Sequence, residues 1–243
     1  LEVGPGGALY VVDMYRAVVE HPQWVPAELK NRPDNYSGND RGRIYRVVPV
    51  EHTVANRDEV APGLGRVSGT QLVEELKSSN GWRRDTAARL IYQKQDRSVV
   101  DDLQRLASGQ DEVIGRIHAL WALDGLGALG PETVGLALAS RESPVVVQAL
   151  RLCEPHLASH PELLGKVDRR QLENPAVRFQ WLMSQVRHPG SAEAKTAVPL
   201  VELAVAVSLS APCDSWTLTA LIAGCGRHGL LLLSQLVDAA SQK

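Results

Sequence analysis

The sequence is poor in aromatic residues, and this scarcity limits the fold class. Phe, Trp and Tyr together make up 5% of the 243 residues, whereas Leu, Ala and Val are abundant. Strands are enriched in aromatic side chains, and helices favour Ala and Leu. The composition therefore predicts a mainly α-helical protein rather than an all-β core.

Cysteine is also scarce. The chain has 3 Cys, namely Cys153, Cys213 and Cys225, which are too few for a disulfide framework. A bridge between Cys213 and Cys225 would suit an oxidising compartment. We predict buried free thiols instead, because unpaired Cys behaves as a small apolar residue.

The chain lacks an excess of basic residues and long apolar runs. Lys and Arg number 26 against 28 Asp and Glu, giving a formal net charge of -2. This balance argues against general nucleic-acid binding, which needs a basic face, and leaves room for a local basic groove alone. No apolar run reaches the roughly 18 residues that a membrane span needs, so we predict no membrane-spanning helix in this chain.

Motifs of catalysis and targeting are absent as well. We find no phosphate-binding glycine loop, His-Glu-x-x-His pair, nucleophile elbow or EF-hand series, and no N-terminal signal. The chain begins at Leu1, inside what reads as a structural unit. We therefore expect a fragment or a processed piece of a longer protein.

A pattern that returns about every thirty residues organises the rest of the chain. It runs through four segments: Arg84-x-x-Ala87, Arg116-x-x-Ala119, Val146-x-x-Ala149 and Arg178-x-x-Trp181. The anchor positions 87, 119, 149 and 181 are 32, 30 and 32 residues apart. Such a period, with apolar residues at helical spacing, is typical of stacked helix pairs that share one core. We predict an α-solenoid of HEAT-like helix pairs, an α-α superhelix, over residues 69–243, with the anchors in the helix–helix seams.

Turn and capping residues divide this region into helices. We place Thr70, Asp111 and Ser143 as N-caps, and Pro131 in a first helical turn. The predicted helices cover 71–78, 82–95, 98–108, 111–126, a segment starting at 131, 144–156, 161–172, 174–187, 192–208, 214–225 and 230–240.

Arginine recurs three residues before three of the four anchors. We interpret Arg84, Arg116 and Arg178 as stacking or ion-pairing residues between repeats, with Asp85, Asp124 or Glu173 as partners. The alternative is a basic ladder along a groove that binds an anionic partner. Val146 interrupts such a ladder.

Residues 1–50 follow a different pattern. Segments 8–15 and 43–48 carry β-branched and aromatic residues, which predict a hairpin. Segment 8–15 is apolar on both faces, so we expect a strand covered on both sides. Between the strands lies an insert, 18–41, with a short helix over 26–30. We expect the hairpin to rest on the helices or to belong to a larger sheet, and 51–68 to form a linker.

Polar residues gather where the insert leaves the first strand and where it returns. Asp13, Tyr15, Arg16 and His21 lie at the exit, and Asp40 and Arg41 at the return. They are our candidate catalytic or cofactor-binding residues, because loops at strand ends often carry function. The alternative is structural: Asp40 and Arg41 as turn residues, and Asp13 in a buried ion pair with Arg16 or Arg43.

We predict no metal site. Cys153, His156 and His160 have helical spacing and are the candidates for one, but Pro155 and Pro161 interrupt the helix and a fourth ligand is missing. A solvated loop is the expected alternative. We interpret His118, next to Trp121, as a packing histidine in a core helix.

The strings GPGGALYVVDMYR, HPQWVP and GNDRGRIYRVVP, followed by helical repeats, carry a family resemblance. The chain resembles planctomycete-type membrane-bound dehydrogenases. In that family a β-propeller similar to quinone-dependent glucose/sorbosone dehydrogenases precedes HEAT-like repeats and often a cytochrome c domain. The resemblance implies that residues 1–50 are like the last propeller blade. Two departures are that most of the propeller is absent and that no Cys-x-x-Cys-His haem motif is present.

These observations leave two hypotheses for function. The first is a non-catalytic HEAT-like scaffold that binds a protein partner or the missing propeller domain. The second is a fragment of a quinone-dependent sugar or alcohol oxidoreductase whose N-terminal segment contributes to the active site. We expect no cofactor in this chain, quinone and haem belonging to the parent protein, and no nucleic-acid partner. The resemblance implies a periplasmic or membrane-associated location.

Overall fold

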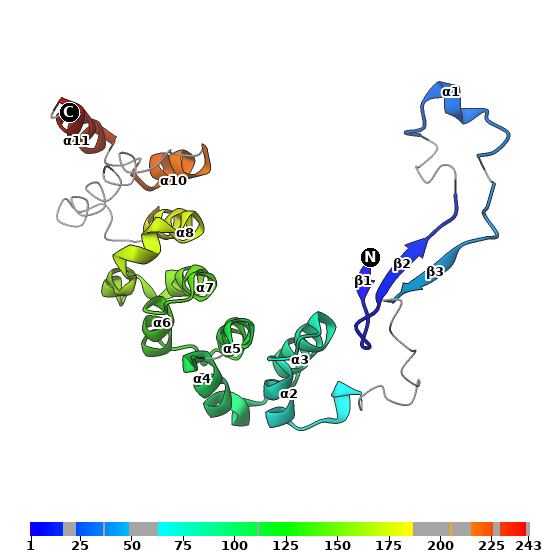
Figure 1. Ribbon diagram of the computed structural model, residues 1–243, viewed down its shortest axis with the longest axis horizontal. Helices are drawn as coiled ribbons and strands as arrows, with labels where there is room; N and C mark the ends of the chain where they lie inside the picture. Colours follow the sequence, from blue (N-terminus) through cyan, green and yellow to red (C-terminus); the bar gives the residue numbers. More distant parts are fainter. Residues whose placement is uncertain are drawn as a thin grey trace.

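The computed structural model describes residues 1–16, 23–35, 37–48, 63–110, 112–186, 205, 215–225 and 229–241. The protein is mainly helical, with a small three-stranded antiparallel sheet at its N-terminal end (Figure 1). The prediction of a mainly α fold is therefore confirmed.

The sheet consists of β1 (Glu2–Val3), β2 (Leu9–Asp13) and β3 (Arg43–Val47), in the order β1-β2-β3. Leu9 pairs with Val47 at one end of the β2–β3 ladder, and Asp13 pairs with Arg43 at the other. Both predicted strands are confirmed. The two-residue β1 was missed because it is too short to show an alternating pattern.

The strands are not covered on both faces within the described part of the chain, so that prediction is wrong there. Val12 on one face is 68% exposed, and Val47 on the other is 52% exposed. A strand buries both faces only when two further layers supply side chains to cover it, and the described helices supply none.

The insert carries the predicted short helix, α1 (Ala27–Lys30), which follows Pro26 as its N-cap. The side-chain amide of Asn35 donates to the Leu29 carbonyl oxygen at 2.7 Å and to that of Lys30 at 3.0 Å. These bonds satisfy carbonyl groups that the last helical turn leaves without partners.

The helical part begins with α2 and continues in pairs joined by short turns. The α-helices are α2 (Gly69–Glu75), α3 (Gly81–Lys94), α4 (Val100–Ser108), α5 (Val113–Gly125), α6 (Pro131–Leu138), α7 (Ser143–Cys153), α8 (Pro175–Val186), α10 (Ser215–Cys225) and α11 (Gly229–Ser241). Short 3₁₀ helices connect them: η2 (Leu64–Arg66), η3 (Arg97–Val99), η4 (Glu154–His156), η5 (Pro161–Lys166) and η6 (Arg169–Glu173).

Two predicted N-caps are wrong. Ser68 caps α2, because its hydroxyl and the Gln71 side chain form a reciprocal capping box that Thr70 cannot form from inside the helix. Glu142 is the N-cap residue of α7, and the Ser143 hydroxyl donates instead to Gln171 Oε1 at 2.7 Å. Asp111, the third predicted cap, lies outside the described residues.

The continuous helix predicted over 161–172 is also wrong. Two 3₁₀ helices, η5 and η6, take its place. Val167 between them has extended backbone, and the Asp168 side chain accepts a hydrogen bond from the Arg170 backbone N–H at 2.9 Å. Asp168 thus starts a new turn and ends the previous one. The predicted helix 192–208 lies outside the described residues, apart from Val205.

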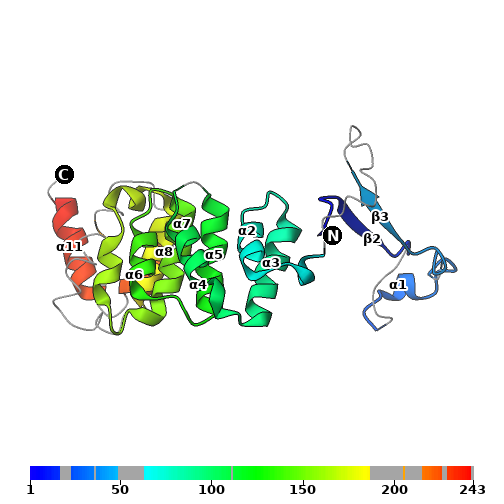
Figure 2. The same ribbon diagram turned by 90° about the horizontal axis from the view of Figure 1, so that it is seen from below.

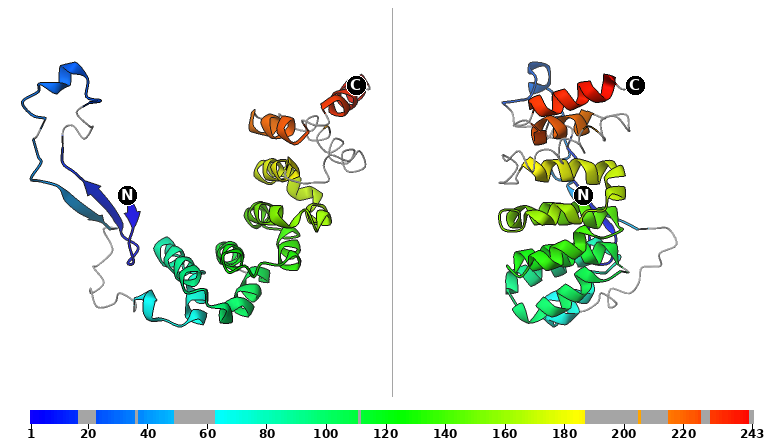
Figure 3. Two further views of the ribbon diagram at one scale, coloured as in Figure 1. Left: turned by 180° about the vertical axis from the view of Figure 1, so that it is seen from behind. Right: turned by 90° about the vertical axis from the view of Figure 1, so that its left-hand side faces the viewer.

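The helices form two rows. In Figure 1, α3, α5, α7 and α8 lie on the inner side of a curve, and α2, α4 and α6 lie on the outer side. Each inner helix contacts the next inner helix, and α2, α4 and α6 contact one another in sequence. Viewed from the end, the helices are stacked with roughly parallel axes (Figure 3). We call α2 to α8 the helical array.

The core runs between the two rows, and the four repeat anchors lie in it. Ala87, Ala119, Ala149 and Trp181 are all buried, as predicted. The array also includes Leu64, which the sequence places in a linker but which is buried in the same core.

The sheet lies at the end of the helical row (Figure 2). Asn80 connects the two parts: its side-chain amide donates to the Pro5 carbonyl oxygen at 2.8 Å, and its Oδ1 accepts from the Trp82 backbone N–H at 3.0 Å. One residue thus caps α3 and contacts the turn between β1 and β2.

Candidate functional site

The end of β2 forms the candidate site that the sequence predicts. Asp13, Tyr15 and Arg16 line a cavity of about 490 Å³ together with Tyr45 of β3. The strand register places Arg43 opposite Asp13 and Tyr45 opposite Val11. We call Asp13, Tyr15, Arg16, Arg43 and Tyr45 the strand-exit site.

Arg43 is the centre of this site. Its guanidinium carbon lies 4.1 Å from the centroid of the Tyr15 ring and 5.8 Å from that of Tyr45. Its Nε lies 3.9 Å from Asp13 Oδ2 and donates to the Arg41 carbonyl oxygen at 3.0 Å. The predicted Asp13–Arg43 ion pair is confirmed, but it is not buried, because both side chains keep more than a third of their surface exposed. An ion pair this exposed contributes little stability.

The backbone at Tyr15 adopts a left-handed conformation that is uncommon for an aromatic residue, with φ of 48°. Its N–H donates to Asp13 Oδ1 at 2.8 Å. Gly38, where the insert returns, has φ of 80°, and a Cβ built there would lie 1.9 Å from the Tyr15 carbonyl oxygen. The close approach requires glycine at position 38, and it brings the two ends of the insert together.

The other predicted residues lie apart from the cavity or outside the described residues. Asp40 and Arg41 are strongly exposed and pair with each other at 3.9 Å in the turn before β3. Arg16, by contrast, lines the cavity, and it also contacts the insert, since its Nη2 donates to the Asn35 carbonyl oxygen at 3.3 Å. His21 lies outside the described residues. The strand-exit site therefore unites Asp13, Tyr15 and Arg16, but not Asp40 and Arg41.

Comparison with known proteins adds one finding, and it concerns this segment. Residues 1–51 match the model of a domain of unknown function, DUF7133. The match covers the sheet and the insert with α1, and it ends before η2, the first described element of the helical part. No curated protein and no solved structure matches the chain.

Beyond the DUF7133 segment, the structure does not bring the three metal candidates together. Among the described residues, no group of three or more His, Cys, Asp and Glu side chains could hold a metal ion. Cys153 is fully buried, and its thiol donates to the Leu150 carbonyl oxygen at 3.1 Å. Burial raises the pKa of this thiol to about 12, and the Glu154 carboxylate adds to the shift. His160 instead lies beside Glu162, with 3.2 Å between Nδ1 and Oε1.

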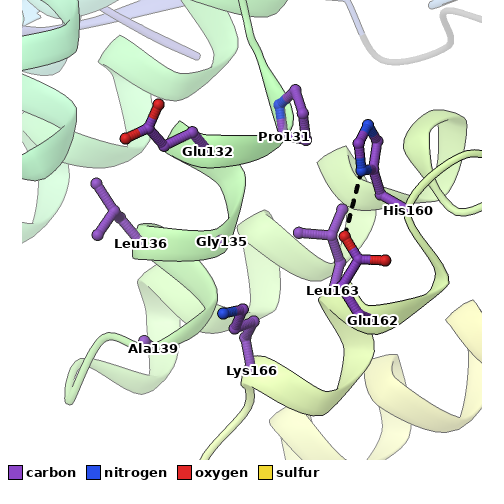
Figure 4. A pocket seen from close by; sticks show the side chains of 9 residues that line it. All are labelled: Pro131, Glu132, Gly135, Leu136, Ala139, His160, Glu162, Leu163 and Lys166. Carbon is purple, nitrogen blue, oxygen red and sulfur yellow. Dashed lines mark hydrogen bonds and ion pairs between the residues drawn. The ribbon is translucent and has the colours of Figure 1, made fainter.

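His160 and Glu162 border a groove between α6 and η5 that the sequence did not predict (Figure 4). Its volume is about 390 Å³, and its lining is largely apolar, with Leu136 and Leu163 among the lining residues. Charged side chains surround it, with Glu132 and Lys166 on different sides (Figure 4). No sequence motif marks the groove, because it forms where a helix meets a 3₁₀ turn.

The inner row of helices exposes a second feature that the sequence analysis missed. Tyr92 of α3 is 60% exposed, and Ile114 and Trp121 of α5 are 50% and 44% exposed. The spacing of 114, 118, 121 and 125 places them on one face of α5, opposite its buried residues. The Tyr92 ring lies against Gly125, where an added Cβ would be 2.9 Å from Tyr92 Cδ2. We call Tyr92, Ile114 and Trp121 the aromatic stripe.

The stripe is held in position by its neighbours. The Trp121 indole N–H donates to Gln148 Oε1 on α7 at 3.2 Å. His118 lies half-buried between Ile114 and Trp121, and burial lowers the pKa of its imidazole despite the opposing effect of Asp85. A lowered pKa keeps this histidine neutral at pH 7. The sequence signal that could have revealed the stripe is that α5 carries large apolar residues on both of its faces, and a helix at the edge of a core can bury only one of them.

The recurring arginines do not form the ion pairs that we predicted. Instead, each donates to a carbonyl oxygen at the end of the outer element of its own pair. The donors and acceptors are Arg84 Nη1 to Ser78 at 2.7 Å, Arg116 Nε to Ala107 at 3.3 Å and Arg178 Nη1 to Leu172 at 3.4 Å. A cation at the C-terminal end of a helix donates to carbonyl groups that lack a partner within the helix, and its charge interacts favourably with the helix dipole. The buried Arg116 and Arg178 are therefore caps rather than parts of an open basic ladder.

None of the described helices has the length and apolar character that a bilayer crossing needs. The longest, α3, has 14 residues.

Proposed function

We propose that this chain is a protein-interaction module in which HEAT-like helix pairs form a scaffold. The spacing of 32, 30 and 32 residues between buried anchors supports this proposal, as do the two rows of helices in Figure 1. Stacked helix pairs make extended concave surfaces, which is how such arrays bind partners.

The observation that carries the proposal is the aromatic stripe. Tyr92, Ile114 and Trp121 expose large apolar surfaces side by side on the inner row. Exposed clusters of this kind mark interaction sites, and Trp and Tyr are among the residues that contribute most to binding. The Trp121 ring is already oriented by Gln148, so its side chain loses less conformational entropy when a partner packs on it.

The side chains around the stripe indicate the chemistry of the partner. Arg89 and Arg151 occupy the positions in α3 and α7 that Trp121 occupies in α5, and all three are exposed. Neither Arg89 nor Arg151 forms an ion pair with another described residue. A protein segment with an apolar anchor for the stripe and carboxylates toward the two arginines fits this surface best.

Site-specific photo-crosslinking tests the proposal. The photoreactive residue p-benzoylphenylalanine is placed at Trp121 in one variant and at Leu136, which is exposed on the outer row, in a matched control. We expect a single protein to crosslink from position 121 and not from 136 when the chain is expressed in its source cells. Binding of that purified protein should weaken about 30-fold or more in W121A, since loss of a central Trp costs at least about 2 kcal/mol.

Two results contradict the proposal. One is equal crosslinking from both positions, which indicates random contact. The other is unchanged affinity of the captured protein for W121A, which places its binding surface elsewhere.

The second candidate function is a contribution to a quinone-dependent oxidoreductase in a longer protein. It is supported by the strand-exit site, whose cavity unites a carboxylate, a phenol and a guanidinium next to the strained Tyr15. Strained backbone of this kind collects at functional sites. The family resemblance of residues 1–50 points the same way, and it implies a periplasmic or membrane-associated location next to a propeller.

Quinone binding by the longer protein tests this candidate. We expect pyrroloquinoline quinone to bind, and R16Q to weaken the binding, because the Arg16 side chain borders the cavity. R32Q is the control, since Arg32 pairs with Asp34 in the insert, away from the cavity. Absence of quinone binding, or equal affinity in R16Q, contradicts the candidate.

A further inference from the structure

A polar cavity lies between the C-terminal ends of α4 and α6, apart from the strand-exit site and the aromatic stripe, and it shares Leu136 and Ala139 with the groove beside η5. Its volume is about 420 Å³, and Ser108, Gln110, Arg116, Ser140 and Arg141 supply its polar lining. We propose that this cavity is a binding site for an oxyanion, a phosphate or carboxylate group held between Arg116 and Arg141.

The first argument is the burial of Arg116. The residue is 4% exposed, yet no carboxylate of the described residues lies within ion-pair distance of its guanidinium. Burial lowers the pKa of Arg116, and the Glu142 carboxylate opposes that shift from farther away. A buried cation is costly unless a counter-charge compensates it, and an anion in the cavity would do so.

The second argument is the orientation of this guanidinium compared with its repeat equivalents. Arg84 and Arg178 use Nη1 to cap the preceding element, and their Nε atoms are buried without a partner among the described residues. Arg116 uses Nε instead. No hydrogen bond or ion pair joins its two Nη groups to another described residue. These groups belong to a side chain that lines the cavity.

The third argument is the set of donors around the cavity. The Arg141 side chain is exposed and borders the same cavity. Ser140 Oγ accepts from the Glu142 backbone N–H at 3.2 Å, which leaves its own hydroxyl hydrogen to donate. Ser108 and Gln110 add a hydroxyl and an amide. Two guanidinium groups with hydroxyl donors match the several acceptor oxygens of phosphate or carboxylate.

An NMR titration of the full chain tests the site. Sodium phosphate replaces sodium chloride at constant ionic strength, and the Arg116 Nε–Hε signal and the backbone amides of 108–110 and 139–141 are followed. We expect saturable shifts confined to these groups. A parallel titration with sodium acetate distinguishes the two ligands, since the tighter of the two identifies the preferred oxyanion.

Variants assign the binding to the two arginines. R141Q should weaken phosphate binding about tenfold or more, because it removes one charge-assisted hydrogen bond, and R116Q should abolish it. R178Q is the matched control for R116Q, since Arg178 has the same repeat position and does not line the cavity. R169Q is the exposed control for R141Q, since Arg169 is exposed on η6 and does not line the cavity. Both controls should keep the wild-type affinity.

The proposal is overturned if the shifts are spread over the chain without saturation, or if R141Q binds phosphate as tightly as R169Q does. If R116Q fails to fold, R141Q still decides the question, because Arg141 is exposed and its side chain makes no hydrogen bond or ion pair with another described residue.

Discussion

The sheet and the helical array treat apolar side chains in opposite ways. In the sheet, Val12 and Ile44 are 68% and 67% exposed, although they form a cross-strand pair. In the array, Leu103, Leu120 and Leu123 are fully buried. Each helix pair obtains its missing apolar surface from the next pair, whereas the sheet finds no such partner among the described residues. Both regions thus carry large apolar side chains, but among the described residues only the array buries them in a shared core.

The two regions also differ in how their backbone ends are satisfied. In the array, hydrogen bonds cross from one pair to the next: Arg97 Nη1 donates to the Leu126 carbonyl oxygen at 2.8 Å, and Gln171 Nε2 donates to that of Arg141 at 2.6 Å. The sheet end of the described chain is joined to the helices by the Asn80 side-chain amide, which donates to the Pro5 carbonyl oxygen at 2.8 Å and to that of Gly4 at 3.5 Å. The array should therefore unfold as a unit that hardly involves the sheet.

The largest effect should separate a buried leucine from an exposed isoleucine. L120A should lower the free energy of unfolding by about 2–5 kcal/mol, the usual cost of a cavity in a packed core. I44A should lower it by less than about 1 kcal/mol, because the Ile44 side chain is already exposed. Urea denaturation followed by circular dichroism at 222 nm measures both. Equal losses in the free energy of unfolding would show that Ile44 is packed as tightly as Leu120, which contradicts the contrast between the two regions.

A smaller effect should come from a recurring arginine. R84M should destabilise the array by about 1–2 kcal/mol, because the Ser78 carbonyl loses a charged donor. R89M is the control on the same helix, where Arg89 is exposed and has no capping role; a surface change of this kind is within about 0.5 kcal/mol. If the two variants have the same urea midpoint, the capping role of Arg84 is wrong.

The helix cap of α2 gives the next effect. S68A should cost about 1 kcal/mol, because it removes the capping box with Gln71. T70A should be nearly neutral, since Thr70 is exposed inside the first turn of the helix. Thermal melting compares them, and a larger loss in T70A than in S68A would restore the cap that the sequence alone suggested.

The smallest effect should follow removal of the sheet. A chain of residues 63–243 keeps Leu64 in the core and Ser68 as the cap. We expect its melting temperature to stay within about 4 °C of the full chain, since loss of the Asn80 hydrogen bonds to the turn costs about 1 kcal/mol, which corresponds to about 2–4 °C for a chain of this length. Aggregation or a drop of more than about 5 °C would show that the sheet protects the end of the array.

Much of the array could be predicted because its signals are local and repeated. Anchors at 87, 119, 149 and 181 lie in the core as their spacing indicates, and Pro131 starts α6. The caps of α2 and α7 were placed one or two residues away from the true positions, since a hydroxyl residue near a helix start looks like a cap in sequence whether or not the helix begins there. The segment 161–172 failed because its apolar spacing suits an α-helix as well as two 3₁₀ turns.

The candidate sites divide in the same manner. Asp13, Tyr15 and Arg16 are close in sequence, so their convergence could be predicted, and the register of β2 and β3 added Arg43 and Tyr45. The cavity between Arg116 and Arg141 could not be predicted, because it depends on how the ends of α4 and α6 meet. For the same reason, the spacing of Cys153, His156 and His160 does not become a cluster of ligands.

The sequence by itself determined the helical class, the thirty-residue period and the residues that fill the seams, because these follow from composition and periodicity along one chain. The tertiary structure alone decided which apolar residues are covered and what the recurring arginines do. Exposure of Trp121 and Ile44, and the choice of Nε or Nη as the capping group, depend on neighbours that pack from other elements. Burial is a property of surfaces that meet, and a single segment does not specify what it will meet.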